Sequence, residues 1–391
     1  MTRLLRWPLA ALALCALAGP LQAQDPGMAR AFELERRGNY ADAADAYRGV
    51  LRARPGDPGA LLGLERVLLP LGRSAEIAPQ VQAAEAANGP STAILGVAMR
   101  GWAAADQPDS MRTVAERWAA IAPGDETPYR EWGAAALTRR DRPGAMAAYK
   151  LGRERLHRDD ALAPELAQLA VADGDFSTGL REWLAAVRRL PGYRVTAINT
   201  LGPVPESARS GLLSQLARES DFPARRLEAD LRARWGDPLR ALETLASALP
   251  DDRVRSIEAL RGLLDQFRTQ PGRDARLATG RALELLADRS VDAERARLRL
   301  DAARAYTAAG EGEAARRMLT GIAEDRSAPG TIASGATTTL VQVLIGDGKL
   351  DEAATRLRDH RAELSSEDYA GLERRLALGY IRAGNLDRAD S

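Results

Sequence analysis

The sequence has very little of the side-chain chemistry that catalysis and metal binding most often use. It contains one cysteine and two histidines in 391 residues. Cys15 lies in an N-terminal segment that we expect to be removed, so the remaining chain would have no thiol for a disulfide, a metal site or a nucleophile. His157 and His360 are far apart, with no carboxylate or thiol cluster at ligand spacing. We therefore expect no metal, no cofactor and no enzyme activity.

An excess of charge of either sign is also missing. The chain has 55 basic and 54 acidic residues, which gives a formal net charge of +1. This balance provides no global field that would attract nucleic acid or an anionic membrane, so we expect neither as a partner. After the N-terminal segment, no apolar run is long enough to span a bilayer.

Residues 1–23 have the pattern of a secretory signal peptide. Arg3 and Arg6 form a basic region that precedes a short apolar stretch. The stretch is shorter than the ~20 residues that cross a bilayer, which favours cleavage near Ala23 over a membrane anchor. The residue before Cys15 is leucine rather than a small residue, which argues against lipidation. We expect an exported protein, periplasmic or secreted, with no transmembrane segment after signal removal.

Aromatic residues are scarce, at 5% of the chain, although 45% of the residues are hydrophobic. The core must therefore come mainly from alanine and leucine, which both favour helices. Long runs with β-branched alternation are absent. These features predict an all-α protein.

A pattern of glycine, aromatic residue, small residue and proline recurs along the chain. It is clearest in GNYADAADAYRGVLRARPGDP, residues 38–58. Frames spaced by 34 residues align without insertion or deletion, beginning at Gln24, Pro58, Thr92, Glu126 and Asp160. The fifteenth position of these frames holds Gly38, Gly72, Asp106, Arg140 and Gly174. A period of this size indicates stacked helix pairs.

Each repeated position has a structural reason. A glycine after the first helix can adopt the left-handed conformation that ends it, and a proline stops the second helix. Small residues such as Gly133 suit close helix crossings, and Tyr47, Tyr149 and Trp183 fill the space beside them. The pattern resembles the tetratricopeptide repeat family over residues 24–193. This resemblance implies a right-handed superhelical solenoid of antiparallel helix pairs.

The register loosens after these five repeats. Residues 194–290 are expected to form a divergent helical-repeat segment, with a joint near 199–207 where prolines interrupt the pattern. Residues 291–391 contain further repeats, the last of them incomplete. Because solenoids normally end in a polar cap, we interpret the incomplete repeat as a truncation of a longer protein.

Acidic and basic residues alternate with helical spacing in the divergent segment. Glu228 and Asp230 stand four residues before Arg232 and Arg234. Such pairs usually mark a solvated helix face, and this is the interpretation that the sequence favours.

The family resemblance also implies a binding surface, because positions 2, 5, 9 and 12 of the first helix face the inner groove of such repeats. The residues that we assign to this surface are Leu62, Arg66, Leu69, Arg100, Arg130, Gln168, Leu300 and Arg304. Arg66 and Arg100 share a repeat position and should stack as a ladder, which suits a peptide bearing carboxylates. The alternative is that arginine is simply the common basic residue here, because Lys150 and Lys349 are the only lysines.

These observations predict a non-catalytic scaffold for protein or peptide partners in the bacterial cell envelope. The chain also resembles the periplasmic repeat region of bacterial exopolysaccharide-export proteins, which implies association with an outer-membrane complex. Both hypotheses keep the helical-repeat fold and differ in the partner.

One segment raises an enzyme hypothesis. LARESDFPAR, residues 216–225, resembles the start of the catalytic segment of lytic transglycosylases, which would make Glu219 a general acid in an apolar pocket. The Gly-Leu-Met-Gln continuation of that family is absent. The competing interpretation is a helix end at Glu219 and a new helix after Asp221 and Pro223.

Overall fold

A computed structural model of the chain describes residues 25–325 and 328–389. The expected signal peptide, its cleavage point near Ala23 and Cys15 lie outside these residues. Within the described ranges the chain forms helices and no strand. Two compact units divide the chain, with the boundary between Leu169 and Ala170.

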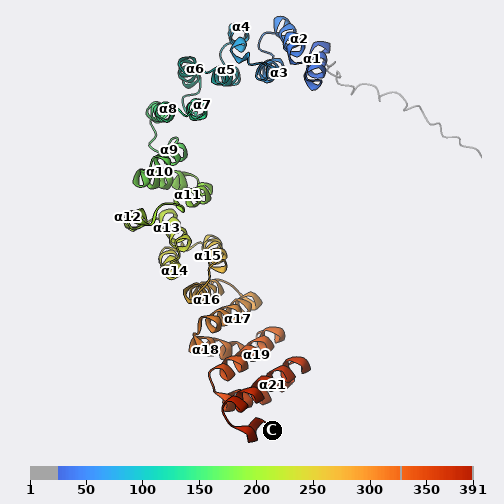
Figure 1. Cartoon of the computed structure of the whole chain (residues 1–391), viewed down its shortest axis with the longest axis vertical. Helices are drawn as coiled ribbons and strands as arrows, with labels where there is room; N and C mark the ends of the chain where they lie inside the picture. The colour runs from blue at the N-terminus through green and yellow to red at the C-terminus, as the bar shows by residue number, and fades with distance from the viewer. Residues whose placement is uncertain (1–24, 326–327, 390–391) are drawn as a thin grey trace, which may run out of the picture. The chain divides into compact units, whose positions relative to one another are not determined.

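Unit 1 contains the helices of the regular repeats (Figure 1). Its helices are α1 (Pro26–Arg36), α2 (Tyr40–Ala53), α3 (Pro58–Leu68), η1 (Ser74–Ile77), α4 (Ala78–Asn88), α5 (Thr92–Ala104), α6 (Pro108–Ile121), α7 (Thr127–Thr138) and α8 (Arg142–Leu156). The unit boundary falls within α9 (Ala163–Ala172). Helices α1, α3, α5 and α7 are the first helices of the predicted pairs, and they begin within two residues of the first four predicted repeat starts.

Unit 2 contains the remaining helices. They are α10 (Phe176–Arg189), η2 (Pro191–Tyr193), α11 (Arg194–Leu201), α12 (Glu206–Leu216), α13 (Phe222–Arg234), α14 (Pro238–Ala246), α15 (Arg253–Arg268), α16 (Arg273–Ala287), α17 (Asp292–Ala309), α18 (Gly312–Ala323), α19 (Gly330–Gly346), α20 (Leu350–Asp359), η3 (Arg361–Glu363), α21 (Ser366–Arg382) and α22 (Leu386–Ala389). Each unit is an all-α solenoid of helix pairs, which confirms the predicted fold class.

Left-handed residues separate the two helices of each regular pair. Gly38 and Gly72 have φ values of 77° and 67°, as the pattern predicts for glycine at this turn. Asp106 and Arg140, at the same repeat position, also have positive φ values of 59° and 62°. The fold thus imposes the same turn where no glycine is present. Asp141 then starts the next helix, since its side chain accepts a hydrogen bond from the backbone N–H of Gly144 at 2.9 Å.

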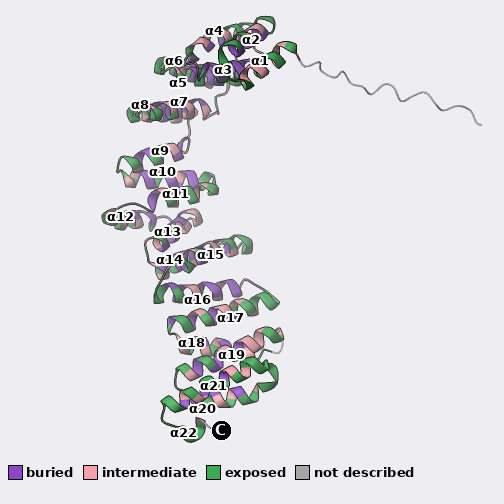
Figure 2. Cartoon of the chain, turned by 45° about the vertical axis from the view of Figure 1, so that its right-hand side comes forward, coloured by how far each residue is buried: buried purple, intermediate pink, exposed green. Residues whose placement is uncertain are grey.

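Close helix crossings in unit 1 use glycine opposite tyrosine, as predicted for Gly133. A Cβ at Gly133 would lie 2.1 Å from Tyr149, and one at Gly63 would lie 2.3 Å from Tyr47. Both tyrosine side chains are buried. Buried residues lie where neighbouring helices face one another (Figure 2). In unit 2, Trp183 is also fully buried, which confirms its predicted packing role.

The prediction of a solvated face on α13 is wrong. Glu228 and Asp230 are only 1% and 3% exposed. Helix α13 contacts α11, α14 and α15, so these positions point into the protein. Arg225 and Arg232 hold Glu228 from either side, at 2.6 and 2.8 Å. Asp230 pairs with Arg194 of α11 at 2.5 Å instead of with its neighbour on α13.

Candidate partner-binding surface on the first helices

A groove lies between the first helices α3, α5 and α7 of unit 1. Its main hollow has a volume of about 570 Å³, and Leu62, Arg66, Leu69 and Arg100 are among its lining residues. A second hollow of about 420 Å³ shares Leu62 and Arg100 with it. We call this surface the first-helix groove. It brings together four of the predicted site residues.

Two aliphatic side chains of the first-helix groove are exposed to solvent. Leu62 is 42% exposed and Leu69 is 62% exposed. Ala103 and Ala104 of α5 and Ala135 of α7 extend the apolar lining. A single exposed leucine is ordinary, but apolar side chains gathered in one concave surface are typical of a binding site.

The arginine ladder of the groove is bound to carboxylates of this chain. Arg66 donates from Nε and Nη2 to the two carboxylate oxygens of Glu35, at 2.8 and 2.9 Å. Arg100 binds Glu65 in the same bidentate manner, at 2.6 and 2.9 Å. Each pair joins the first helices of successive repeats. Neither glutamate was predicted from the sequence, although the separation of each from its arginine is close to one repeat period and could have indicated it.

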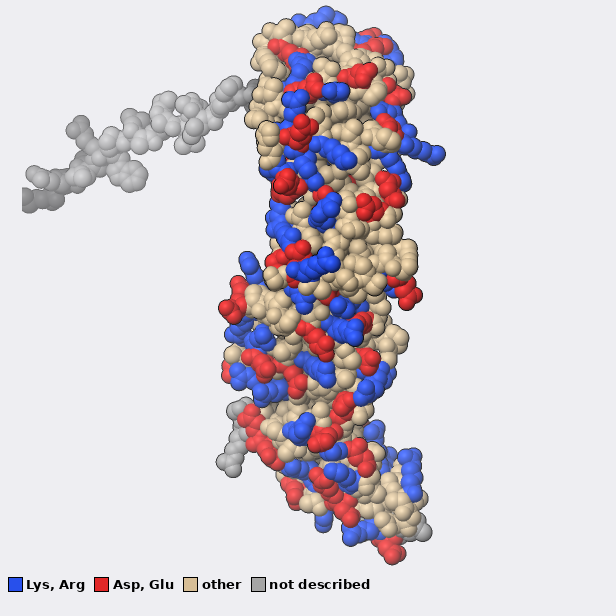
Figure 3. Space-filling view, turned by 90° about the vertical axis from the view of Figure 1, so that its left-hand side faces the viewer, with Lys and Arg blue, Asp and Glu red and all other residues tan. Residues whose placement is uncertain are grey.

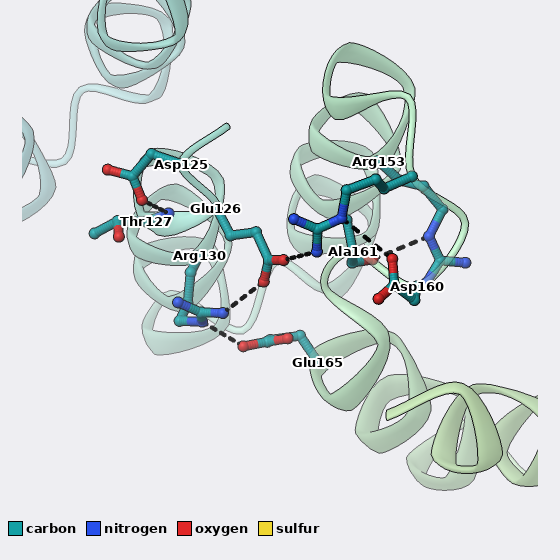
Figure 4. A network of polar contacts seen from close by, with 9 residues as sticks. Asp125, Glu126, Thr127, Arg130, Arg153, Asp160, Ala161 and Glu165 are labelled. Atoms are coloured by element: carbon teal, nitrogen blue, oxygen red, sulfur yellow. Dashed lines mark hydrogen bonds and ion pairs between the residues drawn. The ribbon is translucent and has the colours of Figure 1, made fainter. Parts of the chain in front are cut away.

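Arg130 also pairs with carboxylates of this chain (Figure 4). It donates to Glu165 at 2.5 Å and to Glu126 at 3.0 Å. Glu126 accepts a further hydrogen bond from Arg158 at 2.5 Å. The guanidinium groups of Arg66, Arg100 and Arg130 are therefore already paired with carboxylates of this chain.

Glu35 organises one end of the groove. It accepts a hydrogen bond from the Tyr47 hydroxyl at 2.5 Å in addition to those from Arg66. Arg66 and Tyr47 hold the pKa of Glu35 below its ordinary value against the opposing effect of burial. Burial, together with Glu35, raises the pKa of Tyr47. Near neutral pH the carboxylate stays charged and the phenol neutral, so the cluster positions side chains rather than transferring protons.

The remaining predicted site residues differ in their surroundings. Gln168 is exposed on α9. In unit 2, Arg304 is about half exposed and faces Asp301 at 3.4 Å. Leu300 is only 5% exposed and belongs to the core of unit 2. Its assignment to a binding surface is therefore wrong, because the side chain is covered by α19, where a Cβ at Gly335 would lie 3.3 Å from it.

Glu219 does not have the surroundings of a buried general acid. Its side chain is 37% exposed and accepts a hydrogen bond from Arg188 at 2.6 Å. Helix α12 ends at Leu216, and Asp221 caps the start of α13 by accepting from the backbone N–H of Ala224. The interpretation as a helix boundary is confirmed, and this partly exposed carboxylate beside Arg188 does not have the apolar surroundings that the enzyme hypothesis requires.

The histidines lie in ordinary settings. His157 is exposed and ends α8 with a φ of 50°. His360 lies between Arg356 at 3.2 Å and Glu363 at 3.0 Å. The described part of the chain contains no group of three or more His, Cys, Asp or Glu residues that could hold a metal ion. None of its helices is both long enough and apolar enough to cross a membrane.

No protein-family model matches the chain, and no curated protein matches it either. Among solved structures, it is similar to the pentatricopeptide repeat protein PPR10 from maize, with 12% identity, a TM-score of 0.37, and coverage of 93% of this chain and 67% of that one. It is also similar to Naa15/Naa10 bound to HypK-THB, with 13% identity, a TM-score of 0.28, and coverage of 93% and 66%. For the P58(IPK) TPR domain the values are 15%, 0.24, 93% and 98%. At these TM-scores the fold assignment rests on the chain's own helix pairs.

Proposed function

We propose that the chain is a non-catalytic scaffold of the cell envelope that holds a protein partner in the first-helix groove. The observation that supports this most directly is the pair of exposed leucines, Leu62 and Leu69, in a hollow of about 570 Å³. Large apolar side chains in a concave surface bind partner side chains by excluding water.

The charges around the groove refine the kind of partner. A partner carboxylate would have to displace Glu35 from Arg66 or Glu65 from Arg100, and both are bidentate contacts. On the face drawn in Figure 3, basic and acidic side chains are interspersed, without a large field of one sign. A protein segment that presents apolar side chains to the leucines and polar groups to the rim fits this surface better than a strongly acidic peptide.

A crosslinking experiment tests the groove. A photo-reactive amino acid placed at Leu69 should form adducts with a partner in cells, and the adducts should disappear when Leu62→Glu is added. Leu190 is 56% exposed in unit 2 and provides a control position of the same residue type and similar exposure. Equal adducts from positions 69 and 190, or adducts that persist with Leu62→Glu, would exclude the first-helix groove as the binding surface.

Export to the envelope is part of the same proposal and rests on the N-terminal sequence pattern. The exported protein should begin at or near Gln24 and carry no lipid, because the leader is short and Leu14 precedes Cys15. Intact-mass measurement of the protein from the envelope fraction checks this. A diacylglyceryl adduct on Cys15, or an uncleaved N-terminus, would contradict it.

A further inference from the structure

A second groove lies on unit 2, mainly on helices that carry none of the predicted site residues. Helices α14, α16 and α18, with one residue of α17, line a hollow of about 760 Å³. We call it the second-helix groove and define it by Leu239, Glu243, Arg281, Leu285, Arg317 and Met318. It lies outside the surface that the proposed function uses.

The hollow continues beyond these residues. A neighbouring hollow of about 540 Å³ shares Asp288 with it. A third, of about 120 Å³, shares Arg299, Gly321 and Ile322 with it. Adjoining hollows that share lining residues form an elongated surface, which suits a polypeptide segment better than a compact small molecule.

The floor of the second-helix groove is apolar. Leu239 of α14, Leu285 of α16 and Met318 of α18 pack on the core of unit 2 but remain only partly buried. Leu242 and Ile322, which also line the hollow, are buried at 4% exposure. The groove therefore offers a row of aliphatic and thioether surface that an apolar stripe on a partner could cover.

The two sides of the groove have opposite charges. Glu243 lies on α14, whereas Arg317 lies on α18 and Arg299 on α17. Within residues 25–325 and 328–389, Glu243 and Arg299 form no ion pair or side-chain hydrogen bond with one another or with any other residue. Arg317 has only a 3.7 Å contact with Glu313, and both side chains are more than 70% exposed.

Between these sides, α16 contributes Arg281 and Glu284 to the lining, and Asp288 follows the last residue of this helix. Glu284 accepts a hydrogen bond from the Tyr306 hydroxyl. The charges of this segment lie between the two sides of the groove, so they do not distinguish one side from the other. The electrostatic character of the groove is set by the opposite charges of its two sides, one on α14 and the other on α17 and α18. These charges are available to a partner.

We propose that the second-helix groove binds an amphipathic helix of a partner protein. The apolar stripe of the helix covers the floor, its basic edge lies along Glu243, and its acidic edge lies along Arg299 and Arg317. Reversing the direction of a docked helix exchanges its two edges, so a helix with one basic and one acidic edge can always find a matching direction. A helix with two edges of the same sign meets repulsion on one side in either direction.

Three designed helical peptides test the proposal by fluorescence anisotropy with the full chain at low salt. All carry the same leucine stripe, with Lys/Glu, Lys/Lys or Glu/Glu edges. The Lys/Glu peptide should bind the wild type about fivefold more tightly than the other two, and the difference should shrink as salt is added. Glu243→Arg makes both sides basic, so the preference should move to the Glu/Glu peptide.

The matched control is Asp265→Arg. Asp265 lies on α15 of the same unit with 72% of its side chain exposed, and it forms an ion pair with Arg268 of the same helix. The Asp265→Arg substitution changes the net charge by the same amount as Glu243→Arg and should leave the peptide preference as in the wild type. Leu69→Glu should also leave it unchanged, which separates this groove from the proposed function.

Several results would overturn the proposal. These are absence of binding by all three peptides, equal binding of the three, or the same preference in Glu243→Arg as in the wild type. Self-association of the full chain in sedimentation that Glu243→Arg abolishes would also overturn it, because the occupant would then be a second copy.

Discussion

Arginine–carboxylate pairs occur in both units, but in different surroundings. In unit 1, Arg66 and Arg100 are about half exposed and reach carboxylates of neighbouring repeats across the first-helix groove. In unit 2, Glu228 and Asp230 are almost fully buried with their arginines around them. An exposed pair contributes little stability and mainly fixes the side chains of a surface. A buried pair, by contrast, makes the fold depend on both partners remaining in place.

The largest loss of stability that we expect from a single substitution is in the core of unit 2. Trp183→Ala removes a fully buried side chain, so we expect a loss of about 3–5 kcal/mol in the free energy of unfolding. Urea titration followed by far-UV circular dichroism measures it. Val254→Ala, at a side chain that is 75% exposed, should change the value by less than about 0.5 kcal/mol. Equal stability of the two variants would show that the packing of α10 is misassigned.

Removal of one carboxylate from each unit tests the comparison directly. Glu228→Ala leaves Arg225 and Arg232 without their partner at a position that is 1% exposed, so we expect a loss of about 3 kcal/mol. Glu65→Ala removes the partner of Arg100, which is 45% exposed and can be hydrated, so the loss should be below about 1 kcal/mol. Similar losses from the two variants, measured by the same urea titration, would contradict the expected difference between the exposed ion pair of unit 1 and the buried ion pair of unit 2.

The sequence was sufficient for features that depend on local geometry. A glycine that ends a helix and a glycine under a tyrosine both follow from spacing within one repeat, as Gly38 and Gly133 show. The burial of Glu228 could not be predicted in this way, because it depends on which helices cover α13. Leu300 was assigned from its repeat position, and its burial depends on how closely α19 packs against α17.

The candidate site was only partly predictable for a related reason. The pattern placed Leu62, Leu69 and Arg100 on one surface, since they share a helix face or a repeat position. The pairing of Arg66 with Glu35 needs the distance between two helices, which sequence spacing alone does not fix. The expectation of a carboxylate-bearing peptide followed from treating the arginines as unpaired.

A close crossing in unit 1 gives the next prediction. Gly133→Ala would place a Cβ 2.1 Å from the Tyr149 ring, so either the helices or the ring must move. We expect a loss of about 1–3 kcal/mol, which is typical of overpacking. Gly49→Ala is the control, because its nearest atom would be 3.7 Å away on a flexible arginine, and it should stabilise α2 by about 0.5–1 kcal/mol. A stabilising Gly133→Ala would contradict the predicted crossing.

The smallest effect concerns pH, and its sign should differ between the units. The pKa of Glu35 is lowered, mainly by Arg66, so the folded state favours the ionised carboxylate. Its contribution is present above the unfolded value of about 4.3 and is lost as the pH falls through the folded value. The advantage of the wild type over Glu35→Gln, below about 1 kcal/mol at pH 7, should therefore shrink on acidification. Urea titrations between pH 7 and pH 3 measure this difference.

Asp230 provides the comparison for that experiment. Burial raises its pKa even though Arg194 lies 2.5 Å away, so the folded state binds a proton more readily than the unfolded state. The free energy of unfolding of the wild type, relative to Asp230→Asn, should then decrease as the pH rises above about 3.9, the value in the unfolded chain. The two variants should thus give differences from the wild type that change in opposite directions over the same range. Changes in the same direction for both variants would contradict the opposite pKa shifts of Glu35 and Asp230.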